Sequence, residues 1–429
     1  MSVWQTVVPP PEYRRNYTLM GLDLSLFVLG LSFVSVYGVM PLYVHHLTKS
    51  NLALGLIATV RAIGSSLPPI LAARWTERLR RKKPFLLVMT TFERLPYLVI
   101  AVATLLLAGS HPLLLLWLFF AMNAIGTWFG GLGLPAWLDI LAHMLPPDWR
   151  GRFFGFSSAL GGLLGVIGAG VAALLLERYD WPDGFALCFV CTAVSLGVSF
   201  IFIANSREPA PVDEAPAKVA SGDYWRRLPG IVRDDHNFAW YLAATVLVSA
   251  AGMATSFYTV DAERTLHLTD ASAGVYAVVL LLASTVGSIA WGYVGDHVGH
   301  KRVVEGGALC TGLAALIALL VRGPGIGLVG YGLVFVLVGV ATSGLQLAAL
   351  TFIVDFAPGA QRPTYIGIAN LAAVPFSAGA PLLGGIIADR AGYPIVFAIT
   401  LVLAFAATLI VYGRVVDPRM RDRDDLAVQ

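Results

Sequence analysis

The chain has 429 residues, of which 57% are hydrophobic and 13% are charged, and its formal net charge is +3. A charged fraction of roughly half the usual value leaves too little polar surface for a water-soluble protein of this length, which excludes a soluble enzyme or binding module. The small and dispersed positive charge excludes a nucleic-acid partner. The apolar excess predicts an all-α integral membrane protein whose surplus apolar surface faces lipid.

The N-terminal half begins with a polar tail, residues 1–18, which lacks the cleavage site of a signal peptide. We expect this tail to be cytosolic. A membrane-spanning helix needs about 20 mostly apolar residues. Six segments of that kind follow, at 19–44, 51–73, 84–108, 112–142, 153–176 and 184–204. Residues 19–204 are therefore predicted to form a six-helix bundle.

A polar, proline-containing stretch at 205–237 interrupts the apolar series and is predicted to be a cytosolic linker. Six more apolar segments follow, at 238–260, 271–292, 303–321, 327–353, 365–388 and 394–412. Residues 238–412 are predicted to form a second six-helix bundle, and 413–429 a cytosolic C-terminal tail. The sequence thus predicts 12 transmembrane helices with short loops.

The distribution of lysine and arginine predicts the orientation of the chain. If both termini are cytosolic, the inner segments hold 22 of these residues and the outer loops hold 5. Such a bias is the pattern that places basic loops inside the cell. We therefore expect both termini in the cytosol and the protein in a bacterial-type inner (plasma) membrane.

The two halves also repeat one another. When the halves are aligned in a single register, five positions of the first half fall on identical or similar residues of the second: Arg150 on Arg362, Gly155 on Gly367, Glu177 on Asp389, Arg178 on Arg390, and Phe185 on Phe397. The two predicted bundles are therefore pseudo-symmetric. Repeated halves of the same orientation are a recurring plan of secondary transporters, whose solute site lies near the middle of the membrane.

The most specific motif lies between the eighth and ninth segments, where residues 292–302 read GYVGDHVGHKR. This loop resembles the G-x-x-x-D-[RK/H]-x-G-[RH]-[RK]-[RK] signature of the major facilitator superfamily. The corresponding first-half loop, 72–83, keeps the basic cluster but has Thr76 or Glu77 where the acidic residue is expected. The resemblance covers nearly the whole chain and implies that family's fold of two six-helix bundles. It does not identify a subfamily.

The resemblance also implies a cytosolic latch that stabilises one state of the transport cycle. In this sequence the latch residues are Asp296, Lys301 and Arg302, with Gly292 and Gly299 allowing the tight turn. The basic pair also has a simpler interpretation, as anchors on the cytosolic side. Further gate or latch candidates lie near cytosolic helix ends: Asp23, Asp139, Arg150 and Arg362.

Three charged residues lie deep inside the predicted spans of the first half, away from the span ends: Arg61, Glu93 and Arg94. At 1.5 Å per residue they lie roughly 15 to 20 Å from the cytosolic end, so the three can share one level. Charges at this depth are expensive and usually mark a functional site. We hypothesise that Glu93 neutralises one arginine and the other faces the solute cavity. The alternative is a purely structural ion pair.

Neutral polar and aromatic residues complete the candidate cavity. In the first half they are Tyr37, Asn123 and Trp128, and in the second half Tyr258, Gln346 and Asn370. For each aromatic residue, ordinary core packing is the competing interpretation.

These features favour a secondary transporter that moves a small organic solute by alternating access. The sequence lacks the G-x-x-x-x-G-K-[ST] loop of an ATP-driven pump, and the H-E-x-x-H and G-x-S-x-G motifs of intramembrane enzymes. Two arginines against one glutamate favour an anionic or zwitterionic solute, with protons as a candidate coupling ion. Two alternatives stay open, efflux of lipophilic compounds and a receptor or scaffold that does not transport. We expect a monomer without metal or cofactor.

Overall fold

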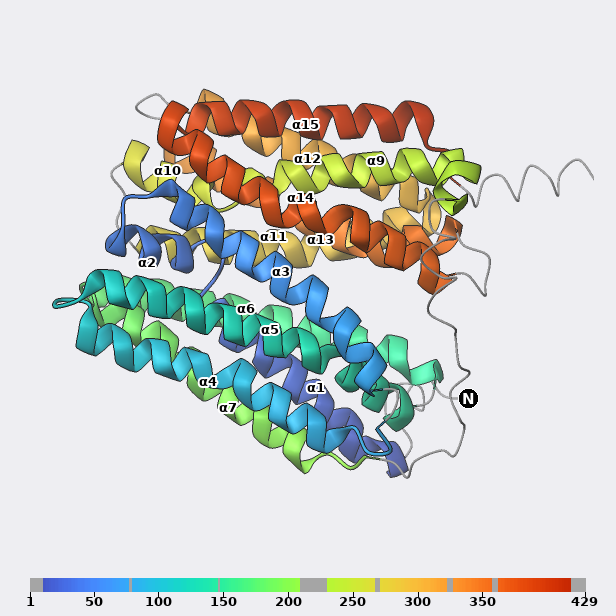
Figure 1. Ribbon diagram of the computed structural model, residues 1–429, viewed down its shortest axis with the longest axis horizontal. Helices are drawn as coiled ribbons and strands as arrows, with labels where there is room; N and C mark the ends of the chain where they lie inside the picture. Colours follow the sequence, from blue (N-terminus) through green and yellow to red (C-terminus); the bar gives the residue numbers. More distant parts are fainter. Residues whose placement is uncertain are drawn as a thin grey trace, which may run out of the picture. The chain divides into compact units, whose positions relative to one another are not determined.

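The computed structural model describes residues 11–76, 79–145, 147–208, 230–266, 271–321, 327–356 and 362–417. Within these ranges every regular element is a helix (Figure 1). Eleven segments of the described chain are long and apolar enough to cross a membrane. The all-α prediction is therefore confirmed for the part of the chain that is described.

The helices follow the predicted spans closely. The first half contains α1 (Pro11–Ser32), α2 (Val39–Leu47), α3 (Asn51–Thr76), α4 (Lys83–Leu107), α5 (Pro112–Met144), α6 (Pro147–Arg178) and α7 (Asp183–Asn205). The second half contains α9 (His236–Ala251), η2 (Gly252–Ala254), α10 (Phe257–Leu266), α11 (Ala271–His297), α12 (His300–Leu320), α13 (Gly327–Phe356), α14 (Arg362–Ala391) and α15 (Tyr393–Arg414). Ten of the twelve predicted spans each correspond to one helix.

The other two predicted spans are broken. The first, 19–44, is divided by turns at residues 33–38 between α1 and α2, where the amide of Tyr37 donates to Ser35 Oγ at 3.3 Å. The seventh, 238–260, changes at Gly252 to the short 3-10 helix η2, and α10 then continues to Leu266. Both breaks contain glycine and hydroxyl side chains, which offer the backbone local alternatives to the helix.

The broken spans open the first and second halves, so they occupy corresponding places in the repeat. The two broken spans can be aligned at the helices that follow the breaks, with Val39 of α2 on Phe257 of α10. In this alignment Asp23 corresponds to Tyr241. Interrupted helices at corresponding positions of two repeats are the best sequence-level indication of a transporter's binding region.

The contacts divide the chain into two compact units. Unit 1 comprises Met1–Thr48, Val60–Pro216 and Thr269–Val278, and unit 2 comprises Lys49–Thr59, Ala217–Leu268 and Val279–Gln429. The units follow the two sequence halves except that the first turns of α3 belong to unit 2 and the first turns of α11 belong to unit 1.

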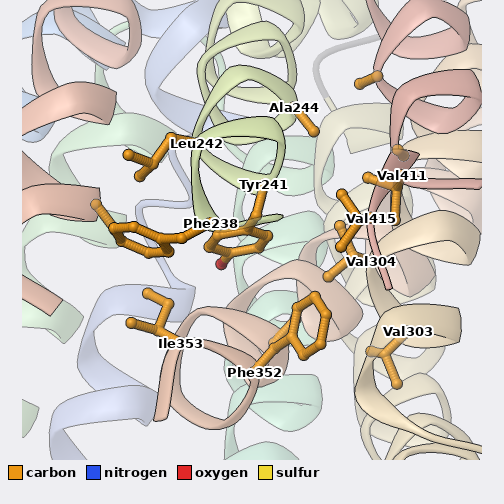
Figure 2. Close-up of a cluster of buried hydrophobic side chains, with 14 of the residues drawn as sticks. Phe238, Tyr241, Leu242, Ala244, Val303, Val304, Phe352, Ile353, Val411 and Val415 are labelled. Carbon is orange, nitrogen blue, oxygen red and sulfur yellow. The ribbon is translucent and has the colours of Figure 1, made fainter. Parts of the chain in front are cut away.

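Each unit has its own apolar core. In unit 1, one buried cluster gathers Met20 of α1, Leu86 of α4 and Phe153 of α6. In unit 2, Phe238 and Tyr241 project from α9 towards Phe352 and Ile353 of α13 (Figure 2). Helices α4, α5 and α15 have a proline in their first turn. Proline lacks a backbone N–H, but the N–H groups of the first turn have no partner within the helix, so no helical hydrogen bond is lost.

Candidate functional site

A buried ionic network joins four helices of unit 1. Arg94 of α4 lies 3.4 Å from Asp23 of α1 and 3.2 Å from its neighbour Glu93. Asp23 also accepts hydrogen bonds from Ser199 Oγ of α7 at 2.5 Å and from Trp137 Nε1 of α5 at 3.1 Å. Asp23 is 3% exposed and Arg94 is 7% exposed. The four helices are thus tied together by charge-assisted hydrogen bonds.

All five N–H groups of Arg94 have partners inside the protein. Its Nε donates to the carbonyl of Leu196 at 3.0 Å, and its Nη1 donates to the carbonyl of Thr90 and to Glu93, both at 3.2 Å. Its Nη2 donates to Asp23 and, at 3.1 Å, to Ser199 Oγ. The guanidinium therefore has no donor left for a solute in this arrangement.

The network contains one more negative group than positive groups. Asp23 and Glu93 face a single guanidinium, so the three groups carry a net charge of −1 when both carboxylates are ionised. A net charge in a water-poor interior is unfavourable. One added proton makes the group neutral, and the network is for this reason a chemically suitable place to bind and release a proton.

The network lines a cavity of about 160 Å³ between α1, α4, α5 and α7. Its wall includes Asp23, Glu93, Arg94 and Trp137, and is otherwise mostly apolar. Gly130 of α5 faces Glu93 so closely that a Cβ at this position would overlap the Glu93 carboxylate. A larger residue at this position would therefore have to displace the glutamate side chain.

Arg61 lies apart from this network, on α3. Its side chain is exposed, and no ion pair joins it to another residue of the described ranges. Tyr97 of α4 is within electrostatic reach of both Arg61 and Glu93. The structure thus brings Glu93 to Arg94 and leaves the Arg61 guanidinium accessible.

The remaining first-half candidates do not join the ionic network. Tyr37 lies in the turns between α1 and α2. Asn123 donates to the carbonyl of Phe119 within α5 at 3.3 Å. Trp128, also on α5, is 38% exposed.

The three second-half candidates have different surroundings. Tyr258 is 3% exposed and stacks on Phe397, with ring centroids 5.0 Å apart. Gln346 and Asn370 have exposed side chains on α13 and α14. Asn370 lines a second cavity, of about 180 Å³, within unit 2.

The latch candidates lie between α11 and α12 and at neighbouring helix ends. Gly299 has a φ of 116°, a left-handed conformation that favours glycine. Lys301 and Arg302 pair with Glu305 of α12 at 3.6 and 2.7 Å. Gly292 lies inside α11 rather than in the turn, so the expectation that it allows the tight turn is wrong, and no described residue of a neighbouring helix packs within 4 Å of the position that a Cβ would take.

Of the further gate candidates, Asp139 pairs with Lys82 at 2.5 Å and with His143 at 3.3 Å. The side chains of Asp296, Arg150 and Arg362 lie outside the described part of the structure. Their predicted role as a latch stays a prediction.

Sequence reasoning missed several buried polar residues. Asp261 follows directly after the predicted seventh span. In the structure it belongs to α10, is 4% exposed, and accepts a hydrogen bond from the hydroxyl of Tyr331. Glu305 lies within a predicted span and is 7% exposed. Ser199 and Trp137 could not be recognised, since serine and tryptophan are common in apolar helices and only the fold brings them to Asp23.

A second missed feature holds the start of α3 in unit 2. Asp389 of α14 accepts hydrogen bonds from the amide and side chain of Asn51, both at 2.9 Å, and from the amide of Leu52 at 3.2 Å. The hydroxyl of Tyr393 donates to Asn51 Oδ1 at 2.5 Å. Asp389 thus caps the N-terminus of α3 with a negative charge, which is the favourable sign at that end of a helix.

Comparison with known proteins gives consistent results. The family model described as Major Facilitator Superfamily matches residues 22–262 and 240–427. A protein of Deinococcus radiodurans named as a putative sugar efflux transporter is 27% identical over 59% of this chain and 62% of its own length, so the chain matches less than two thirds of that relative. The gentisate transporter of Corynebacterium glutamicum is 23% identical over 82% of this chain and 79% of its own length.

A solved structure of a D-xylose–proton symporter has a similar fold. It aligns with a TM-score of 0.67 and 15% identity, covering 94% of this chain and 98% of the other. At this level of identity the similarity shows the fold alone.

Among the described residues no group of three or more His, Cys, Asp or Glu side chains could hold a metal ion.

Proposed function

The chain belongs to the major facilitator superfamily of transporters, and we propose that it moves a small organic solute by alternating access, with proton coupling at the Asp23–Glu93–Arg94 network. Its relatives and its fold are those of transporters rather than of enzymes. The two relatives are named for sugars and for an aromatic acid, which favours a polar solute over lipophilic compounds.

The single observation that carries the proton-coupling proposal is the charge imbalance of the network. Two carboxylates share one arginine whose five donors are all used within unit 1. Breaking a buried ion pair strands a charge at high cost, so a movement that separates Asp23 or Glu93 from Arg94 favours protonation of the separated carboxylate. Movement and proton uptake are thereby linked.

The proposed solute is an organic anion or zwitterion. Arg61 supplies a guanidinium whose side chain is exposed on α3, and guanidinium groups bind carboxylates through paired hydrogen bonds. Gentisate, named for one relative, is an aromatic acid of this class. Arg61 and Arg94 then have separate roles, the first in solute binding and the second in holding the network together.

Counterflow in proteoliposomes tests the transport proposal. Vesicles preloaded with gentisate or with D-xylose accumulate the corresponding labelled compound if the protein carries it, without any ion gradient. Vesicles that contain the protein but are not preloaded with solute are the control. We expect counterflow of an anionic probe, reduced at least tenfold in Arg61→Ala and reduced less in Arg61→Lys, which keeps the positive charge but not the paired hydrogen bonds. Normal counterflow by a folded Arg61→Ala protein would remove Arg61 from the site. A protein that binds solute but shows no counterflow with any probe would instead be a receptor.

A further inference from the structure

The two cavities, one in each unit, correspond in the repeat along three of their four helices: α1, α4 and α5 of the first cavity correspond to α9, α12 and α13 of the second, whereas the fourth helix is α7 in the first and α14 in the second. The alignment of the two broken spans places Asp23 of the first cavity on Tyr241 of the second. The alignment of the two halves places Gly133 and Trp137 of α5 on Leu345 and Ala349 of α13, which line the same two cavities. The structure therefore contains two partly corresponding cavities whose chemistry differs between the two halves.

No charged side chain of the described residues lines the second cavity. It lies between α9, α12, α13 and α14, where twelve described side chains line it. Its polar members are Tyr241, Thr245, Ser249 and Asn370, and the remaining eight are aliphatic. No carboxylate, ammonium or guanidinium is among them, so this pocket suits an uncharged ligand group that forms hydrogen bonds.

The polar groups of this pocket have unused hydrogen-bonding capacity. Asn370 and Ser249 make no side-chain hydrogen bond to any other residue of the described ranges, although helical serines often bond to the carbonyl four residues earlier. An amide side chain offers two donors and one acceptor, and a hydroxyl group offers one donor and two acceptor lone pairs. Polar groups in a protein pocket normally find partners, so these are available to a ligand or to water.

Tyr241 is held rigidly at the edge of the same pocket. Its ring packs edge-on against Phe352 at 5.3 Å and is stacked with Phe356 at 5.3 Å, and it is 3% exposed. Figure 2 shows the ring beside Phe238 and facing α13. A hydroxyl group fixed in this way is pre-organised, so little ordering entropy is lost when it bonds a ligand.

The volume limits the size of the ligand group. The cavity measures about 180 Å³, somewhat more than the engineered cavity of ~150 Å³ that holds one benzene molecule. One six-membered ring with a few substituents fits this space.

We propose that the cavity lined by Tyr241, Ser249 and Asn370 is the subsite for a hydroxyl-bearing six-membered ring of the transported solute. The proposal rests on the proposed transport function and names the part of the solute that unit 2 binds. Aliphatic side chains contact the faces of the ring, and the three polar side chains bond its hydroxyl groups. A charged group of the solute is bound elsewhere.

Paired ligands that differ only in ring hydroxyl groups test this subsite. The probes are gentisate against benzoate, and D-xylose against tetrahydropyran, with binding measured by thermal stabilisation of the purified protein. We expect at least one hydroxylated probe to bind the wild type about tenfold or more tightly than its unhydroxylated partner. A tenfold ratio of dissociation constants corresponds to a difference of about 1.4 kcal/mol in binding free energy.

Conservative variants then assign the effect to the pocket. Tyr241→Phe and Asn370→Leu remove hydrogen-bonding groups while keeping shape, and each should lower affinity for the hydroxylated probe about five- to tenfold. Affinity for the unhydroxylated partner should change less than twofold. Thr408→Val on α15, which lines neither cavity and bonds only to the carbonyl of Ala404, is the matched control.

Separate outcomes distinguish the subsite from the transport function. If neither hydroxylated probe binds better than its partner, or if the folded variants keep the preference, the subsite proposal is wrong even where counterflow proceeds. If counterflow is absent for every probe while the hydroxyl preference and its loss in the variants are observed, the subsite stands and the transport proposal fails.

Discussion

The Asp23 carboxylate lies 3.4 Å from the Arg94 guanidinium, and both side chains are almost completely buried. The two residues come from the first and the fourth helix of the chain, and a third charge, Glu93, joins them from the position next to Arg94. Because one arginine serves two carboxylates, the arginine is the structural centre of the group and the carboxylates are the groups that can exchange a proton.

Removing the arginine should destabilise the protein strongly. Arg94→Met leaves two buried carboxylates without a cation, a change that typically costs about 3–5 kcal/mol. Thermal melts in detergent measure the loss. Arg61→Ala, which removes an exposed arginine from the neighbouring α3, is the control and should melt within a few degrees of the wild type.

Neutralising the carboxylates should recover part of that loss. In Arg94→Met with Asp23→Asn and Glu93→Gln, no buried charge is stranded, and the melting temperature should rise above that of Arg94→Met alone. An equal or lower melting temperature for the triple variant would show that packing around Arg94, rather than its charge, dominates.

A larger residue in place of the glycine that faces Glu93 should lower the stability of the protein. A Cβ at Gly130 overlaps the Glu93 carboxylate, so Gly130→Ala should displace the glutamate and cost about 1–3 kcal/mol of stability. Adding Glu93→Ala should relieve the overlap and restore the melting temperature. Gly197→Ala on α7, where no atom lies within 4 Å of the Cβ position, should show no such cost. A stable Gly130→Ala protein would contradict this close packing.

Much of this fold could be predicted from sequence, because apolar segments of membrane-spanning length are an unambiguous signal. The breaks near Tyr37 and Gly252 were not predicted, since hydropathy is insensitive to local backbone geometry. Glu93 and Arg94 were recognised as intramembrane charges. Their association with Asp23, which sequence spacing placed near a helix end, depends on the packing of α1 against α4 and α7. No sequence pattern specifies such contacts.

The cap on α3 should contribute measurably to unit 2. Asp389→Ala removes the acceptor of three hydrogen bonds at the helix start, and loss of a cap costs about 0.5–2 kcal/mol. Glu177 is its counterpart in the alignment of the two halves, with an exposed side chain at the end of α6. Glu177→Ala should therefore leave the melting temperature unchanged. Equal effects of the two substitutions would argue against a specific cap.

The predicted orientation can be checked by labelling single cysteines in intact cells. Ser221, Asp422 and Asp270 lie outside the described residues and within the predicted linker, C-terminal tail and outer loop. Because lysine and arginine are concentrated on one side, a membrane-impermeant maleimide should label Asp270→Cys and should not label Ser221→Cys or Asp422→Cys. Labelling of Asp422→Cys from outside would be incompatible with an even number of spans.

The proton-coupling claim is tested most directly by solute-driven proton movement into proteoliposomes, followed with a pH-sensitive dye trapped inside. A solute that gives counterflow is added outside without any initial pH gradient. We predict a change in internal pH with the wild type, and none with Asp23→Asn or Glu93→Gln proteins that fold and still perform counterflow. Solute-driven proton movement that persists in a folded double variant, Asp23→Asn with Glu93→Gln, would contradict the assignment of coupling to this network.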